Sequence, residues 1–224
     1  MTENTDKKNV ARLQDHLKYG TPNTRWTAVR ELLEIGDEEV VIILKEALSD
    51  DDLNVRWEAA VALAELGCKE SVPILLKALE DKRVSNRWVA AEKLAMVADE
   101  SIIPKLLLLL KNPDPTIRQV VIKVLGEMKM NIIVPSIKEM LEDTDFDVRW
   151  EAAYVLKDLG DDSGIKVFRE GLRHENPLMR LQSIWSLSEF RDKSVIAAFE
   201  YIAANDPKTE IREEAQEALK KFKK

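Results

Sequence analysis

The chain has 224 residues, of which 45% are hydrophobic and 33% are charged, so it has enough apolar material for a buried core and enough charge for a hydrated surface. Its formal net charge of −7 argues against nonspecific nucleic-acid binding, because phosphates require a basic protein surface. The single cysteine, Cys68, excludes an intramolecular disulfide, and neither a secretory signal nor an apolar stretch of membrane-spanning length is present, so we expect a cytoplasmic protein without membrane contact.

An arginine recurs along the chain at a spacing of 31 residues, which lengthens to 32 at the last step. Mostly small or apolar residues follow each arginine at offsets of three, seven and ten, and the residue at offset seven is always leucine. These offsets define one face of an α-helix, so each arginine marks the second helix of a repeated helix pair. The arginines are Arg25, Arg56, Arg87, Arg118, Arg149, Arg180 and Arg212.

The first predicted helix lies near residues 6–19, where Val10, Leu13 and Leu17 occupy the apolar positions of a first helix. The last predicted helix lies near residues 208–222. Because a single pair cannot bury its own apolar face, neighbouring pairs must stack. We therefore predict an all-α, right-handed superhelical solenoid of seven pairs, with the second helices on its concave face. It forms one domain, residues 1–224, with pairs at 6–35, 38–66, 71–98, 101–129, 132–159, 162–190 and 193–222.

The helix boundaries are marked by residues with strong capping preferences. Asp52, Asp114 and Asp145 stand where they can accept hydrogen bonds from the first amides of a second helix. Glycines follow several second helices, at a position that favours a left-handed C-cap, and prolines lie in the first turn of the next first helix. The repeat arginines should pair with acids of adjacent turns and form a ladder. The glycines and prolines are Gly36, Gly67, Gly160, Pro73, Pro104 and Pro135.

The pattern Asp-x-x-Val-Arg-Trp-Glu-Ala-Ala-x-x-Leu-x-x-Leu-Gly occurs at residues 52–67 and 145–160. It resembles the short HEAT repeat of the phycobilisome-lyase type, and the resemblance covers nearly the whole chain. Proteins with such repeats include enzymes that attach bilins and their partners, deoxyhypusine hydroxylase with its two irons, proteins that act on alkylated DNA, and many proteins that bind other proteins. The resemblance therefore implies the fold and leaves the function open.

Residues suited to catalysis or metal binding are scarce. The chain has two histidines, His16 and His174, and His174-Glu175 is a lone His-Glu dipeptide, whereas the hydroxylase resemblance requires several. Counted from Asp50, the glycine and glutamate positions of an EF-hand loop are both valine. We predict no catalytic residue, no metal ligand and no cofactor, although an active site assembled from distant carboxylates stays an alternative.

Four of the five tryptophans directly follow a repeat arginine, and further aromatic and acidic residues share their side of the second helices. One interpretation is that each ring packs across the neighbouring second helix and seals the stack. The other is a binding groove, because solenoids bind partners on their concave faces and tryptophan is enriched in binding hot spots. The residues of this hypothetical surface are Trp26, Trp57, Trp88, Trp150, Tyr154, Trp185, Glu58, Glu92 and Glu151.

These patterns favour a non-catalytic interaction scaffold that binds a protein or peptide with basic or apolar character in an acidic, aromatic groove. Carboxylates beside aromatic faces suit lysine or arginine side chains through charge pairing and cation–π contact. The first alternative is an accessory subunit or chaperone-like partner related to bilin lyases. Nucleic-acid binding is a weaker alternative, because it requires a basic groove.

Overall fold

The computed structural model describes residues 2–191 and 193–222, and within these the side chains from residue 8 onward. All regular secondary structure in this part of the chain is helical, which confirms the prediction of an all-α solenoid of helix pairs. The α-helices are α1 (Thr2–Tyr19), α2 (Pro22–Ile35), α3 (Glu38–Ala47), α4 (Leu53–Glu65), α5 (Val72–Ala78), α6 (Val84–Val97), α7 (Ile103–Leu109), α8 (Pro115–Glu127), α9 (Val134–Glu139), α10 (Phe146–Asp158), α11 (Ile165–Gly171), α12 (Pro177–Glu189), α13 (Ile196–Asn205) and α14 (Thr209–Phe222).

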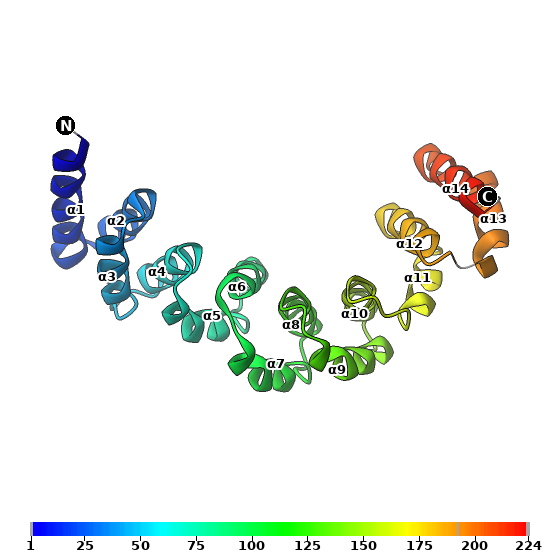
Figure 1. Ribbon diagram of the computed structural model, residues 1–224, viewed down its shortest axis with the longest axis horizontal. Coiled ribbons are helices and arrows are strands. Elements are labelled where there is room, and N and C mark those ends of the chain that lie inside the picture. Colours follow the sequence, from blue (N-terminus) through cyan, green and yellow to red (C-terminus); the bar gives the residue numbers. More distant parts are fainter. Residues whose placement is uncertain (1, 192, 223–224) are drawn as a thin grey trace. The chain divides into compact units, whose positions relative to one another are not determined.

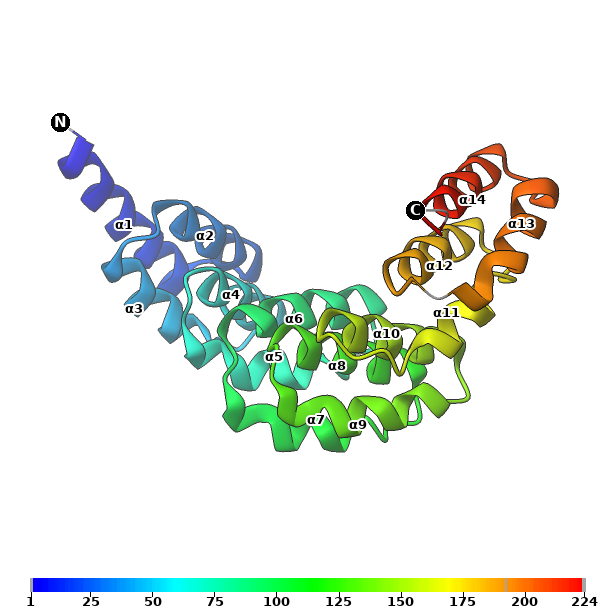
Figure 2. The same cartoon turned by 45° about the vertical axis from the view of Figure 1, so that its right-hand side comes forward.

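The chain divides into two compact units, an N-terminal unit of residues 1–128 and a C-terminal unit of residues 129–224. In the N-terminal unit, the second helices α2, α4, α6 and α8 pack on one another in succession, more closely than the first helices do (Figure 1). In the C-terminal unit, α12 packs against α14, and α13 packs against α14 from the other row (Figure 2). The closer packing of second helices agrees, within the N-terminal unit, with their predicted place on the inner side of a bend. One domain over the whole chain stays a prediction.

The predicted caps are present. Asp52 and Asp145 each accept hydrogen bonds from two amides at the start of their helices, and Asp114 accepts one from Thr116 at 2.8 Å. The three capping glycines have φ angles of 66°, 75° and 79°, the left-handed region in which glycine carries no Cβ penalty. One boundary was wrong: α1 begins at Thr2 rather than near residue 6, because the polar residues before Val10 carry no apolar periodicity that could reveal a helix.

The core lies between the two rows of helices and is built from the same repeat positions in both units. The leucines that follow the repeat arginines by seven residues are fully buried from Leu32 to Leu187. The first helices supply a matching series at the same spacing, in which every residue has a relative exposure of 0%. Burial of such side chains contributes about 1.5–3 kcal/mol each to folding. This first-helix series is Leu44, Leu75, Leu106, Ile137, Phe168 and Phe199.

The repeat arginines hold the turns of the solenoid in two ways. Nη1 of each donates to a backbone carbonyl of the turn before its own helix, as Arg180 does to the His174 oxygen at 2.8 Å. Arg180 also reaches the next turn, where its Nε and Nη2 donate to the two Asp206 carboxylate oxygens at 2.7 and 3.0 Å. Arg25 binds Asp50 in the same bidentate geometry, with both distances 2.8 Å. We call such a bidentate contact a rung.

The predicted ladder of arginines and turn acids is confirmed only in part. Arg87 contacts the turn residue Asp114 at 3.3 Å, as predicted. Arg149 instead binds Glu170, which lies in α11, at 2.6 Å. Arg56 has no carboxylate partner among the described residues, and its guanidinium donates to two backbone carbonyls. The prediction was wrong at Arg149 because the turn position equivalent to Asp50 holds His174. It was wrong at Arg56 because the carboxylate of the equivalent residue, Asp81, accepts hydrogen bonds from Arg83 and Asn86 near its own turn.

We expect the substitution Asn112→Asp to stabilise the protein by completing a rung. Asn112 stands 25 residues after Arg87, the separation found between Arg25 and Asp50, and the buried Nε of Arg87 has no hydrogen-bond partner. A buried donor without a partner costs about 1–3 kcal/mol. A carboxylate here should recover about 1 kcal/mol, net of repulsion from nearby Glu80, and raise the melting temperature by about 2–4 °C in a calorimetric scan. The exposed change Asn131→Asp should leave it within about 1 °C, and equal shifts in the two variants would refute the rung.

Candidate functional site

Trp150 belongs to the core and is therefore not part of the hypothetical binding surface. Its relative exposure is 6%, and its ring meets the Phe168 ring edge to face, with centroids 5.2 Å apart. The ring fills space that a glycine opens in the facing helix, because a Cβ built on Gly171 would lie 2.7 Å from Cζ3 of Trp150. The sequence placed Trp150 in the same repeat position as Trp57, so only the partner helix, with its glycine and Phe168, distinguishes the two.

Trp26 joins two second helices of the N-terminal unit. Its Nε1 donates to Oε2 of Glu58 on α4 at 3.1 Å, and the Arg30 guanidinium lies over its ring, 5.0 Å from the centroid. Arg30 also lies 3.6 Å from the other Glu58 oxygen. Burial raises the pKa of the Glu58 carboxyl, and the Trp26 hydrogen bond and the Arg30 charge oppose that rise. Trp26 thus supports the interpretation of packing between helices, while Trp57 and Trp88 are half-buried.

The carboxylates of this side are partly neutralised by lysines that sequence reasoning missed. Lys93, on α6, has its Nζ 2.9 Å from a Glu65 oxygen on α4 and 3.0 Å from a Glu92 oxygen, with only 13% of its side chain exposed. Although burial lowers it, these two bonds raise the pKa of Lys93 above its ordinary value. Lys93 follows its repeat arginine by six residues, an offset outside the positions compared for the groove, so the predicted surface was more acidic than the structure is.

An exposed aromatic patch spans two second helices of the C-terminal unit. Tyr154 on α10 and Trp185 on α12 occupy the same repeat position, five residues after Arg149 and Arg180, and are 41% and 43% exposed. Lys157 links the two helices, because its Nζ lies 5.4 Å from the Tyr154 ring centroid and 2.7 Å from a Glu189 oxygen. We define the α10–α12 patch as Tyr154, Lys157, Trp185 and Glu189. Glu151, the other residue predicted on this side of α10, is half-buried.

No site suited to metal chemistry is found in the described part of the chain. No three His, Cys, Asp or Glu side chains there converge as ligands. His174 instead accepts a hydrogen bond at Nδ1 from the Asn176 amide at 3.0 Å, and its ring stacks on Phe146 with centroids 4.7 Å apart. In the turn before α14, the equivalent residue is Asp206, whose carboxylate accepts the corresponding hydrogen bond from the Lys208 amide. Among the helices described, none has the length and apolar character needed to cross a bilayer.

Comparison with known proteins identifies the class. The family model for HEAT repeats matches residues 10–95, 73–136 and 134–220, so the chain belongs to the HEAT repeat family. No curated protein matches the sequence.

Solved structures share the fold at low sequence identity. The complex of CpcE and CpcF of phycocyanin lyase from Nostoc sp. PCC7120 contains a chain 23% identical to this one, with a TM-score of 0.55, over 92% of this chain and 85% of that one. YibA of E. coli is 22% identical, with a TM-score of 0.62, over 93% and 81% of the two chains. The archaeal HEAT-like repeats protein from Thermococcus onnurineus NA1 is 13% identical, with a TM-score of 0.60, over 96% and 97%. These likenesses show the fold alone.

Proposed function

We propose that this protein is a non-catalytic interaction scaffold and that the α10–α12 patch binds a protein or peptide with basic or apolar side chains. The observation that carries the proposal is the exposure of two large aromatic rings at one repeat position on adjacent helices. In the N-terminal unit the equivalent positions hold Arg30, Val61, Glu92 and Lys123, so repeat packing does not require an aromatic there. Exposed tryptophan and tyrosine are the side chains most enriched in binding hot spots.

The charge around the patch favours a cationic ligand group. Glu189 is 64% exposed and holds Lys157 through one oxygen, and Asp158 is exposed beside it on α10. A lysine or arginine of a partner that lies on the Trp185 ring could pair with either carboxylate, and each cation–π contact contributes about 0.5–2 kcal/mol. A second candidate surface on the N-terminal unit consists of Trp57, Trp88 and Glu92 with Trp26 and Glu58. Its tryptophans and Glu58 are half-buried, whereas Glu92 is exposed.

The accessory role beside bilin lyases rests on the likeness of fold, which is shared by proteins of many functions. Nucleic-acid binding finds no support on this side of the second helices, because Arg30, Lys93 and Lys157 are each held by a neighbouring carboxylate. For a role as an enzyme, no group of three His, Cys, Asp or Glu side chains that could hold a metal ion is found among the described residues.

The proposal is tested by comparative affinity capture. The wild type, the double variant Tyr154→Ala/Trp185→Ala and the control Tyr19→Ala are immobilised and exposed to an extract of the native source, and bound proteins are identified by mass spectrometry. Tyr19 is a matched control because it is an exposed aromatic residue, 74% accessible, far from the patch in sequence. We expect the wild type and the control to retain the same partner and the double variant to lose it. A partner retained equally by all three would refute the patch as the binding surface, and recovery of a bilin-carrying protein would favour the accessory role.

A further inference from the structure

A pocket lies between two first helices of the C-terminal unit, in the row of helices opposite the α10–α12 patch. A ligand bound there would give the protein a function separate from the proposed one. Its volume is about 940 Å³, and it opens between α11 and α13. This is within the range of cavities that hold small organic ligands, about 300–1,000 Å³. We call it the α11–α13 pocket and define it by Arg169, Leu172, Arg173, Val195, Tyr201 and Ile202.

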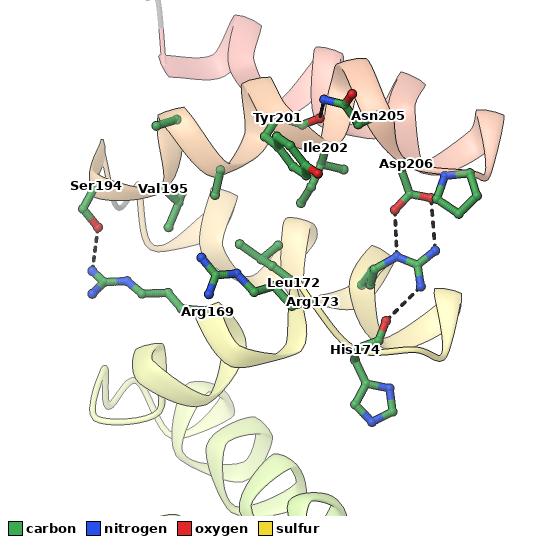
Figure 3. Close-up of a pocket in the computed structure, with 14 residues that line it drawn as sticks. Arg169, Leu172, Arg173, His174, Ser194, Val195, Tyr201, Ile202, Asn205 and Asp206 are labelled. Atoms are coloured by element: carbon green, nitrogen blue, oxygen red, sulfur yellow. Dashed lines mark hydrogen bonds and ion pairs between the residues drawn. The ribbon is translucent and has the colours of Figure 1, made fainter.

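The floor and one wall of the pocket are apolar. Leu172, Val195 and Ile202 are buried, with exposures of 5%, 2% and 7%, so they present only a thin apolar surface to the cavity. Tyr201 stands on the α13 side with 70% of its surface exposed, and Figure 3 shows its ring facing the space above Leu172. An aromatic or aliphatic body placed here would cover apolar surface that is otherwise exposed to water, and this burial favours binding.

The charged groups of the pocket are predominantly cationic although the whole chain carries a formal charge of −7. Arg180 is neutralised by Asp206 in a rung at one end, and Arg169 donates to the Ser194 hydroxyl at 2.7 Å at the other (Figure 3). Arg173 is exposed, and its guanidinium forms no hydrogen bond or ion pair with any side chain the structure describes. An unpaired guanidinium beside an apolar floor is a recognition group for a carboxylate or another planar anion.

We propose that the α11–α13 pocket binds a small organic anion, with a carboxylate or sulfonate held by Arg173 and an aromatic or aliphatic body against Tyr201 and Leu172. The polar pairs at the two ends limit the length of the pocket, and this favours a small ligand over an extended peptide (Figure 3). Arg169 is the second cation within reach of such a ligand, while its bond to Ser194 fixes one edge of the site.

The test is a fluorescence titration of the full chain with 8-anilinonaphthalene-1-sulfonate, an aromatic anion whose emission rises in apolar surroundings. We expect saturable binding at one site per chain. Arg173→Gln should weaken it about tenfold, the loss of one charged hydrogen-bonding partner, whereas Arg83→Gln, an exposed arginine of the other unit, should leave it unchanged. N-phenyl-1-naphthylamine, with the same aromatic body and no charge, should bind about tenfold more weakly than the anion.

A second pair of variants tests the position of the site independently of charge. Ala197 lines the pocket and is exposed on α13, so Ala197→Trp should fill the cavity and abolish the fluorescence change. Ala204→Trp, on the same helix but outside the pocket, is the matched control and should bind as the wild type does. Circular dichroism melts confirm that all variants are folded, because this dye also binds partly unfolded chains.

Competition identifies the source of the anion. Decanoate should displace the dye from the wild type, whereas a short peptide rich in glutamate and phenylalanine should not. Displacement by the peptide alone would overturn the proposal in favour of peptide docking. The proposal is equally overturned if the dye does not saturate, if Arg173→Gln matches Arg83→Gln, or if Ala197→Trp leaves binding intact. None of these results depends on the α10–α12 patch, so the two proposals fail separately.

Discussion

Replacing Trp150 with alanine is expected to cost about 3–5 kcal/mol of unfolding free energy, the loss measured for a large aromatic removed from a core. Trp150 has a relative exposure of 6%, its ring packs edge to face on Phe168, and it occupies the space left by Gly171. The surrounding helices α10, α11 and α12 cannot close over a cavity of that size without moving their backbones. Urea denaturation followed by circular dichroism measures the change.

The control is the same substitution at Trp185, which is 43% exposed on the neighbouring helix. Trp185→Ala should cost about 1 kcal/mol or less, because surface substitutions away from special contacts have small effects. Comparable losses for the two variants would contradict the division of the aromatic series into packing and surface members.

Removing the Asp206 carboxylate is expected to cost a similar amount, about 3–5 kcal/mol, because it leaves the Arg180 guanidinium buried without its counter-ion. Both residues are nearly buried, with exposures of 7% and 9%, and two hydrogen bonds of 2.7 and 3.0 Å join them. The exposed pair of Lys69 and Asp99 provides the comparison. Asp99→Ala should cost much less than the loss of the Asp206 carboxylate, as for other surface ion pairs, although its N–O distance is also 2.7 Å.

The same rung predicts a specific dependence of stability on pH. Burial alone would raise the pKa of Asp206, but the bonds from Arg180 and the Lys208 amide outweigh it and hold the pKa below its ordinary value. The stabilisation is therefore complete above the unfolded-state pKa of about 3.9 and is lost as the pH falls through the lower folded-state value. The stability difference between the wild type and Asp206→Asn should stay constant from about pH 7 to pH 5 and shrink below about pH 4. A difference that grows on acidification would exclude the rung as its source.

Much of this fold could be predicted from the sequence because most repeats carry the same pattern of apolar and capping residues. The spacing of arginine and leucine identified the second helices, and the capping aspartates and glycines fixed their ends. The start of α1 was missed because residues 2–9 are polar and leave no apolar period. At Arg149 the predicted partner was wrong, because the guanidinium binds Glu170 in α11 instead of an acid of a turn. These two residues are 21 positions apart, and no helical period predicts a contact at that separation.

The site was less accessible to sequence reasoning. The tryptophans share one repeat position, yet they differ in environment, because the neighbouring helix presents a carboxylate to Trp26 and a glycine and Phe168 to Trp150. Lys93 and Lys157, which neutralise part of the acidic surface, lie at different offsets from their arginines. The α11–α13 pocket has no sequence signal other than two arginines four residues apart, a spacing that is common on exposed helix faces.

The central claim is that Tyr154 and Trp185 form a binding surface while Trp150 forms the core. The direct test is isothermal titration of the captured partner against Trp185→Ala, Tyr154→Ala and the control Tyr19→Ala, with unfolding free energies measured on the same samples. We predict that the two patch variants lose about tenfold or more in affinity and keep nearly all of their stability, whereas Tyr19→Ala keeps both. Unchanged affinity in the folded fraction of Trp185→Ala and Tyr154→Ala would contradict it.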